Sequence, residues 1–298
     1  MLLILSSWVG TYAIVCMFVL EGNDRTNEEQ RKRPLLLLLG SSAFIAIASI
    51  ANGGVFAPRE CQYEKTSKAD GRHNRVALCV TGSVASVKLP ELVRCMLGEG
   101  MFVDVVLTEA ADFFMKSKYK GTTAADEMVE LLKLKDKSDG TPRVVIWRDE
   151  DEWMSYSRVG KDDVVHVNLA KRNRLLVIAP LSANTLAKIV HGYSSNLLTS
   201  LVRAWYWNLN DIVQKRTPSR PLLVAPAMNT YMWHKDITRA QIRAIEKMGA
   251  VVVHPQTKLL ACGDFGSGAM ADPTDILYEA LRIFPGFSKG GTAGAGAR

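Results

Sequence analysis

The chain has 298 residues, of which 48% are hydrophobic and 22% charged, and this composition is typical of a globular protein with a buried core. The net charge of +7 is modest and spread along the chain, without the interleaved aromatic and basic residues of a nucleic-acid surface, so we expect no nucleic-acid partner. The five cysteines have no CxxC spacing and no accompanying histidine cluster, which indicates neither a disulfide framework nor a metal site.

Residues 1–58 differ in composition from the rest. Two runs without charged residues, Met1–Leu20 and Leu35–Ala57, flank the highly charged segment Glu21–Arg33. Each run is about 20 residues long, which is enough for a helix to cross a bilayer core. Three interpretations stay open: a membrane anchor acting through residues 1–57, a leader that is removed or a start placed too far upstream, and an element of the soluble core.

Residues 59–74 are polar and predict a linker. From Arg75 onward, continuous apolar runs alternate with helical stretches, a pattern typical of a parallel sheet covered on both faces. The expected strands are Val76–Val80, Val103–Leu107, Leu175–Ala179, Leu222–Ala225 and Val251–Val253. The expected helices are Ser86–Gly98, Ala110–Lys116, Ala183–Val190, Asn196–Trp207, Ile237–Met248 and Thr274–Ile283.

This alternation predicts one α/β domain over residues 75–285. We expect a doubly wound parallel sheet in a three-layer sandwich of the Rossmann or flavodoxin-like kind, preceded by the apolar N-terminal extension. Lys118–Arg143 fits the alternation poorly and predicts a charged helix and loop inserted at the surface. Residues 286–298 are rich in glycine and alanine and predict a disordered tail.

The first expected strand runs directly into a turn of small residues, Thr81-Gly82-Ser83-Val84, in front of a helix. Backbone N–H groups at such a helix start suit a phosphate, although the same residues also fit a simple well-capped connection. Gly82 permits close approach and Ser83 adds a hydroxyl donor. Thr108 ends the second strand at the same carboxyl edge, where open α/β sheets bind their ligands.

A second polar turn, Ala179-Pro180-Leu181-Ser182, follows the strand at Leu175–Ala179. Capping of the next helix explains Ser182 by itself. Capping does not explain why a second such turn stands at the same sheet edge as the first. The two turns together indicate one anionic cofactor held between them.

The next strand ends in the unusual sequence Pro226–Trp233. The amide of Asn229 can bind a carboxylate without carrying charge, and Met228 and Met232 can form pliable apolar walls. Packing of both methionines in the core remains an alternative, but it leaves Asn229 without a role.

Two further residues are candidates for catalysis. His166 lies in the apolar stretch Val164–Val167, where a buried core histidine is the alternative interpretation. Cys262 precedes a loop that has three glycines within six residues and can close over a substrate. Its thiol can donate a proton or react directly, and an incidental loop cysteine is the alternative.

Taken together and in this order, these segments resemble the phosphopantothenoylcysteine decarboxylases, within the wider family of homo-oligomeric flavin-containing cysteine decarboxylases. The resemblance covers about residues 75–285. The matching residues are Val80–Ala85, His166, Ala179–Lys188, Asn196–Thr199, Pro226–Trp233, Cys262, Gly263 and Gly268–Ala271.

The resemblance implies a homotrimer with non-covalently bound FMN in sites between subunits, and a cytoplasmic catalytic domain. It implies that the cofactor contacts Gly82, Ser83, Val84, Thr108, Phe114, Ser182, Ala183, Asn184 and Thr185. His166 is implied as the active-site histidine, Asn229 as the residue that holds the substrate carboxylate, and Cys262 as part of a flap over the substrate.

The implied reaction converts 4′-phosphopantothenoylcysteine to 4′-phosphopantetheine in coenzyme A biosynthesis. The substrate carboxylate has no electron sink, so the thiol is first oxidised by FMN to a thioaldehyde with base chemistry near His166. Carbon dioxide then leaves to give an enethiolate, which takes a hydride from FMNH2 and a proton from Cys262.

This chain departs from the family pattern at three places. Arg172-Asn173-Arg174 stands where the family usually has Trp-Ala-Asp, Ser195 replaces the usual Asp, and Lys118–Arg143 is longer than usual. Two alternatives use the same fold: a halotolerance-type regulatory subunit that inhibits a protein phosphatase, and a decarboxylase of peptides with a C-terminal cysteine. The regulators tend to have an acidic C-terminal tail, whereas this chain ends in a glycine-rich segment and arginine.

Overall fold

A computed structural model describes residues 3–9, 12–18, 35–39, 74–119, 121–154, 156–159, 161–210, 215, 219–259 and 265–284. The chain divides into two compact units, Met1–Gln62 and Tyr63–Arg298. The first unit contains an antiparallel sheet in the order β1-β2-β3. Its strands are β1 (Leu3–Val9), β2 (Tyr12–Phe18) and β3 (Leu35–Leu39).

The described parts of the two apolar N-terminal runs are therefore strands, although the length of each run is that of a membrane-spanning helix. Among the described residues, no helix has the length and hydrophobicity needed to span a bilayer. The β-branched and aromatic residues of Leu3–Val9 and Tyr12–Phe18 favour extended backbone, and apolar length alone does not reveal that preference. The predicted linker (except Asn74) and the predicted tail lie outside the described residues.

The second unit is built around a six-stranded parallel sheet in the order β11-β10-β9-β4-β5-β8. Counted along the chain from β4, this order is that of a doubly wound Rossmann-type sheet, as predicted. The strands are β4 (Arg75–Val80), β5 (Phe102–Leu107), β8 (Val144–Trp147), β9 (Leu175–Leu181), β10 (Leu222–Pro226) and β11 (Val251–Val252).

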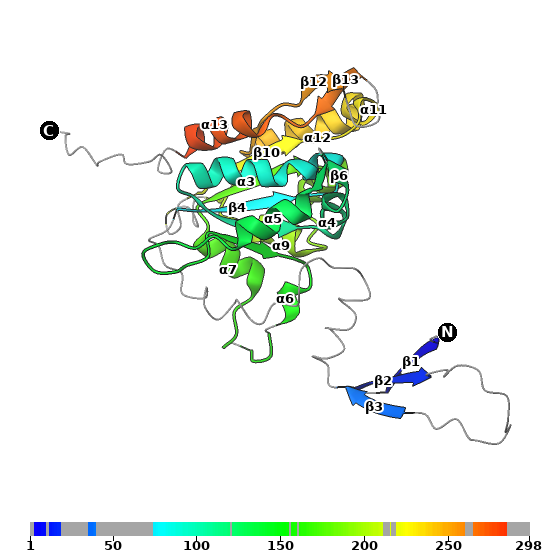
Figure 1. Ribbon diagram of the computed structural model, residues 1–298. Helices are drawn as coiled ribbons and strands as arrows, with labels where there is room; N and C mark the ends of the chain where they lie inside the picture. The colour runs from blue at the N-terminus through cyan, green and yellow to red at the C-terminus, as the bar shows by residue number, and fades with distance from the viewer. Residues whose placement is uncertain are drawn as a thin grey trace. The chain divides into compact units, whose positions relative to one another are not determined.

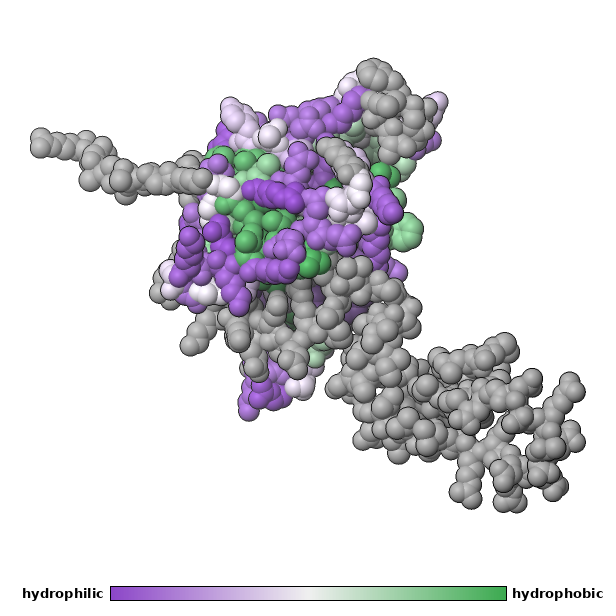
Figure 2. All heavy atoms as spheres, viewed as in Figure 1, coloured by the Kyte–Doolittle hydropathy of each residue, from purple (hydrophilic) through white to green (hydrophobic). Residues whose placement is uncertain are grey.

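Helices cover both faces of this sheet and complete the three layers (Figure 1). Alternate strand residues such as Ala77, Cys79 and Leu176 pack in one cluster with α7 (Val165–Arg172), α8 (Ala183–Val190), α9 (Leu197–Ala204) and α12 (Asp236–Lys247). On the other side, α3 (Leu89–Gly98) contacts α5 (Ala124–Leu132) and α13 (Pro273–Ile283). Figure 2 shows apolar residues gathered over α3 and α5 between hydrophilic ones.

Shorter elements frame the ends of the strands. They are η1 (Val84–Lys88), α4 (Glu109–Met115), α6 (Asp151–Met154), α11 (Thr230–His234), and the hairpins β6 (Lys118–Tyr119)–β7 (Thr122–Thr123) and β12 (Gln256–Leu259)–β13 (Phe265–Ala269). The segment 118–143 is more structured than predicted, since it contains a hairpin and α5. Edge strand β8 follows it, and neither β8 nor α7 was predicted, because a four-residue strand and a short helix give weak periodic patterns.

A buried ionic cluster accounts for one departure from the family pattern. Asp104 on β5 is fully buried and accepts hydrogen bonds from Arg172 Nε at 2.8 Å and from Asn173 Nδ2 at 2.9 Å. Arg75 lies 3.6 Å from the same carboxylate. Burial alone raises the pKa of Asp104, but Arg172, Arg75 and the hydrogen bonds outweigh burial and hold the pKa below its ordinary value. Arg172 and Asn173 thus stabilise the sheet here.

Candidate functional site

The site lies at the carboxyl ends of β4 and β9, the adjacent strands from which the chain winds in opposite directions. Thr81 joins the two turns that follow these strands. Its hydroxyl donates to the carbonyl of Pro180 at 2.9 Å and accepts from the backbone N–H of Ser182 at 2.7 Å. The two turns predicted from the sequence are therefore fixed to each other by one buried side chain.

Three hydroxyl residues begin the helical segments around this edge. Ser83 accepts from the N–H of Ala85 at 3.3 Å, Thr108 from the N–H of Ala111 at 3.2 Å, and Ser182 from that of Thr185 at 3.3 Å. The capping interpretation is thus correct for Ser83 and Ser182, and the cap made by Thr108 was not predicted.

Gly82 is required by close packing of the first turn against α4. A Cβ atom at Gly82 would lie 2.5 Å from the Cβ of Ala110, which is too close for any other residue without a backbone shift. The glycine therefore brings the turn after β4 against the start of the helix after β5.

A cofactor-sized hollow of about 730 Å³ opens between these turns. All the predicted cofactor residues line it: Gly82, Ser83, Val84, Thr108, Phe114, Ser182, Ala183, Asn184 and Thr185. The predicted substrate residues Met228, Asn229 and Met232 line the same hollow. The structure thus brings together two sets of residues that lie far apart in the sequence.

Charged groups at the wall of the hollow were not predicted from the sequence. The ammonium of Lys188 donates to the hydroxyl of Ser195 at 2.7 Å. Ser195 is the residue that replaces the aspartate of the family pattern. Asp149 also lines the hollow, and its carboxylate accepts from the N–H of Leu197 at 2.9 Å. Burial, helped by the charges of Glu150 and Glu109, raises the pKa of Asp149 above its ordinary value.

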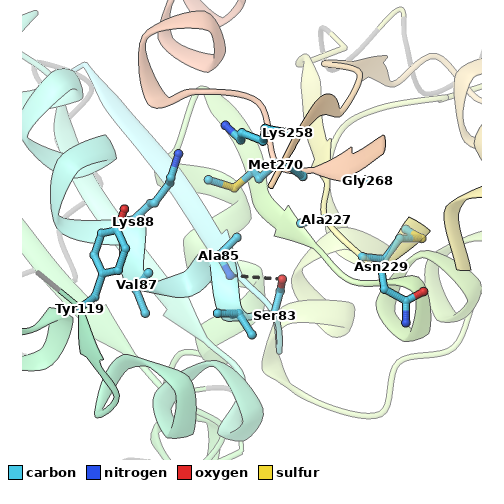
Figure 3. A pocket seen from close by; sticks show the side chains of 13 residues that line it. Ser83, Ala85, Val87, Lys88, Tyr119, Ala227, Asn229, Lys258, Gly268 and Met270 are labelled. Carbon is cyan, nitrogen blue, oxygen red and sulfur yellow. Dashed lines mark hydrogen bonds between the residues drawn. The ribbon is translucent and has the colours of Figure 1, made fainter. Parts of the chain in front are cut away.

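A second pocket of about 370 Å³ shares Ser83, Met228 and Asn229 with the hollow. Two lysines from different parts of the chain, Lys88 on η1 and Lys258 on β12, line it with their ammonium groups near each other (Figure 3). Their Nζ atoms lie 3.0 and 2.9 Å from the same carboxylate oxygen of Asp272. These hydrogen bonds lower the pKa of Asp272 to about 2, so the cluster retains one net positive charge.

Asn229 has a structural role that leaves its other half available. Its side-chain oxygen accepts from the N–H of Met232 at 2.8 Å and so caps α11. Its amide NH2 group donates to no other described residue, and the side chain is exposed at the pocket. The amide can therefore donate to an acceptor such as a carboxylate.

The hairpin β12–β13 lies against the turn that carries Asn229. The N–H of Met228 donates to the carbonyl of Gly268 at 3.0 Å. Gly268 has φ +125°, and a Cβ atom there would lie 2.4 Å from the carbonyl oxygen of Met228, so only glycine fits. The predicted flap residue Cys262 belongs to the connection between β12 and β13 and lies outside the described residues.

His166 stands apart from this group. It begins α7, beside α6, and it lines neither the hollow nor the lysine pocket. Its Nδ1 atom lies 2.6 Å from Oε1 of Glu152 on α6, a partner that no local sequence pattern indicates. Trp153 and Met154, whose apolar side chains are 74% and 55% exposed, lie on α6 beside Glu152.

Comparisons with known proteins point in one direction. A model of the Flavoprotein family matches residues 64–283. A phosphopantothenoylcysteine decarboxylase of Malus domestica named HAL3 is 37% identical over 227 residues, which cover 76% of this chain and 90% of that protein. The phosphopantothenoylcysteine decarboxylase of Mus musculus is 37% identical over 216 residues, covering 72% of this chain and 89% of its own length.

Two solved structures share the architecture of the second unit. One is a PPC decarboxylase mutant complexed with pantothenoylaminoethenethiol, 38% identical with a TM-score of 0.55, and the match covers 72% of this chain and 100% of that one. The other is the FMN binding protein AtHal3, 36% identical with a TM-score of 0.55, covering 72% of this chain and 98% of that one.

Proposed function

Because the chain belongs to the Flavoprotein family, we propose that it is an FMN-dependent decarboxylase of 4′-phosphopantothenoylcysteine in coenzyme A biosynthesis. The observation that carries this proposal is the hollow at the sheet edge. Residues suited to an anionic cofactor and residues suited to a substrate carboxylate line that hollow together.

The residues of the hollow fit FMN. Its polar lining includes the hydroxyls of Ser83, Thr108 and Ser182 and the backbone N–H groups at the start of α8, groups that suit a phosphate, while the carboxylates of Glu109 and Asp149 line another part of the wall. Lys188 adds a positive charge, and Phe114 and Met228 offer apolar surface to a flavin ring. FMN, when bound, supplies the reversible two-electron oxidation that this decarboxylation needs.

The adjoining pocket fits the rest of this substrate. The amide of Asn229 is positioned to donate to the carboxylate that leaves, and Met228 and Met232 to enclose the thiol-bearing carbon. Lys88 and Lys258 carry a net positive charge in the same pocket, which suits a phosphate group. A phosphorylated substrate is therefore favoured over a peptide that lacks a phosphate.

The chain's own residues then handle protons and position the substrate. Oxidation of the thiol to a thioaldehyde creates the electron sink, and carbon dioxide leaves while Asn229 holds the carboxylate. Cys262 delivers a proton as the enethiolate is reduced, and His166 accepts the proton of the substrate thiol.

His166 is proposed to act in the hollow of a second copy of the chain, within a homotrimer. The proposal is supported by the position of His166 outside the hollow and outside the pocket lined by Lys88 and Lys258. It is supported as well by the accessible Trp153 and Met154 on the neighbouring helix, since large exposed apolar side chains are typical of interfaces.

The test is an assay of the purified full-length chain. Its absorption spectrum should show bound flavin, and it should release carbon dioxide from phosphopantothenoylcysteine faster than from the unphosphorylated analogue or from a peptide with a C-terminal cysteine. Cys262→Ser should retain flavin and accumulate the unsaturated product. A flavin-free chain contradicts the proposal, and preference for the peptide favours the peptide decarboxylase instead.

A further inference from the structure

A buried carboxylate holds the histidine on which the proposed reaction depends. Glu152 is only 6% exposed, whereas the side chain of His166 is 26% exposed. One oxygen of Glu152 lies 2.6 Å from Nδ1 of His166, and the other accepts from the backbone N–H of the same residue at 3.2 Å. Both carboxylate oxygens are thus engaged by one histidine.

We propose that Glu152 is the positioning residue for His166, an inference that rests on the proposed function. A carboxylate can only accept hydrogen bonds, so Nδ1 must carry the proton that faces it. The neutral ring then presents the lone pair of Nε2 on its other side, which is the form that a base requires. The bond from the backbone N–H holds the carboxylate of Glu152 at the start of α7, so its other oxygen stays directed at Nδ1 of the ring.

The segment that carries Glu152 is itself anchored to the cofactor hollow. Asp149 lines that hollow and binds the first N–H of α9. The N–H of Arg148 donates to Asp151 at 2.7 Å, which closes the turn that leads into α6. The position of His166 is therefore coupled, through four successive residues, to the wall of its own chain's hollow.

A purely structural role for Glu152 is the competing explanation, and the chain offers a way to separate the two. Val164 is the N-cap residue of α7, has extended backbone and makes no side-chain cap. Glu152 supplies from α6 the cap that Val164 lacks. A serine at position 164 can restore this cap without reaching the imidazole ring.

The first readout needs neither cofactor nor substrate. The full chain is labelled with isotopic histidine, and His166→Asn identifies the signals of the ring by NMR. In the wild-type chain we expect the tautomer with hydrogen on Nδ1. In Val164→Ser/Glu152→Met we expect this preference to be lost, while Val164→Ser alone retains it. An unchanged tautomer in the double variant overturns the inference.

The second readout is the rate at which the absorbance of oxidised flavin falls after anaerobic mixing with phosphopantothenoylcysteine. Loss of an oriented base should slow this step about 10- to 100-fold in Val164→Ser/Glu152→Met. The unfolding midpoint of this double variant should nevertheless lie closer to the wild-type value than that of Glu152→Met alone, because the serine restores the helix cap. Val164→Ser/Glu152→Gln should recover most of the rate, because the amide oxygen can accept from Nδ1 once the introduced serine caps the helix.

The outcomes separate the inference from the proposed function. If the wild-type chain binds flavin but does not react with this substrate, the proposed function fails. If the wild-type chain reacts and the Val164→Ser/Glu152→Met variant reacts equally fast, the function stands and the role of Glu152 is refuted. The role of Glu152 is also refuted if adding Val164→Ser to Glu152→Met restores both the rate and the unfolding midpoint, since loss of the helix cap then explains the whole effect.

Discussion

Two aspartates of this protein each lie between two basic side chains, but one aspartate is buried and the other is partly exposed. Asp104 in the central sheet lies between Arg75 and Arg172 and is fully buried. Asp272 at the lysine pocket lies between Lys88 and Lys258, with 46% of its side chain exposed. Each carboxylate has a lowered pKa.

Burial determines how much each cluster of one aspartate and two basic residues contributes to stability. Water solvates Asp272 and its lysines whether or not they pair, so their attraction contributes little to stability and the lysines remain available to a ligand. The guanidinium groups of Arg75 and Arg172 are buried, so water cannot take the place of Asp104 as their partner. Two cations around one carboxylate are thus buried within the fold at one place and leave accessible lysines in a pocket at the other.

The largest expected effect follows from removing the buried charge. Asp104→Asn leaves two guanidinium groups without a counter-charge and should lower the free energy of unfolding by about 3–5 kcal/mol. Denaturant unfolding of the full chain measures this change. A loss below about 1 kcal/mol would show that water or another group replaces the carboxylate.

A carboxylate added to the pocket should affect catalysis and leave the fold intact. Asn229→Asp retains the cap on α11, because aspartate caps as well as asparagine. It removes the N–H donor and places like charges together, so kcat/KM for the substrate should fall about 10- to 100-fold with flavin retained. Full activity of this variant would remove Asn229 from the substrate site.

Removing the exposed charge should change stability little. Asp272→Asn is expected to alter the free energy of unfolding by less than about 1 kcal/mol, and salt should diminish the difference. Unfolding curves at low and high ionic strength test this. A loss as large as that of Asp104→Asn, independent of salt, would mean that the two clusters are equivalent.

The smallest effect is a difference in pH dependence. A carboxyl with a lowered pKa contributes stability that is complete above its unfolded pKa, near 4, and is lost as pH falls through its folded pKa. For Asp272, with a pKa of about 2, the contribution disappears between about pH 4 and 2. Wild type and Asp272→Asn should therefore converge in stability over this range, and curves that stay parallel would contradict the assignment.

The cofactor edge could be predicted from the sequence because its signals are local. Continuous apolar strands end in small and hydroxyl residues, and the carboxyl ends of parallel strands meet at one edge. The local sequence around Gly82, Ser182 and Asn229 is therefore enough to place these segments at that edge. The helix cap made by Ser182 was predicted, whereas the cap made by Asn229, whose amide oxygen accepts from the N–H of Met232, was not.

The side-chain contacts that the sequence did not predict are between residues that only the tertiary fold brings together. Asp104 meets Arg172 across 68 residues, and Glu152 meets His166 across 14, with no periodic pattern linking either pair. Lys88 and Lys258 converge only because β12 folds back over the sheet edge. For the N-terminal runs the local pattern was ambiguous, since an apolar run is compatible with either a helix or a strand.

The most direct test of the central claim follows the carboxyl carbon of the substrate. Phosphopantothenoylcysteine labelled at that carbon is incubated with the flavin-loaded full-length chain. We expect labelled carbon dioxide in equal amount to 4′-phosphopantetheine, with the flavin returning to its oxidised spectrum after each turnover. A yellow protein that leaves the label in the substrate would contradict it.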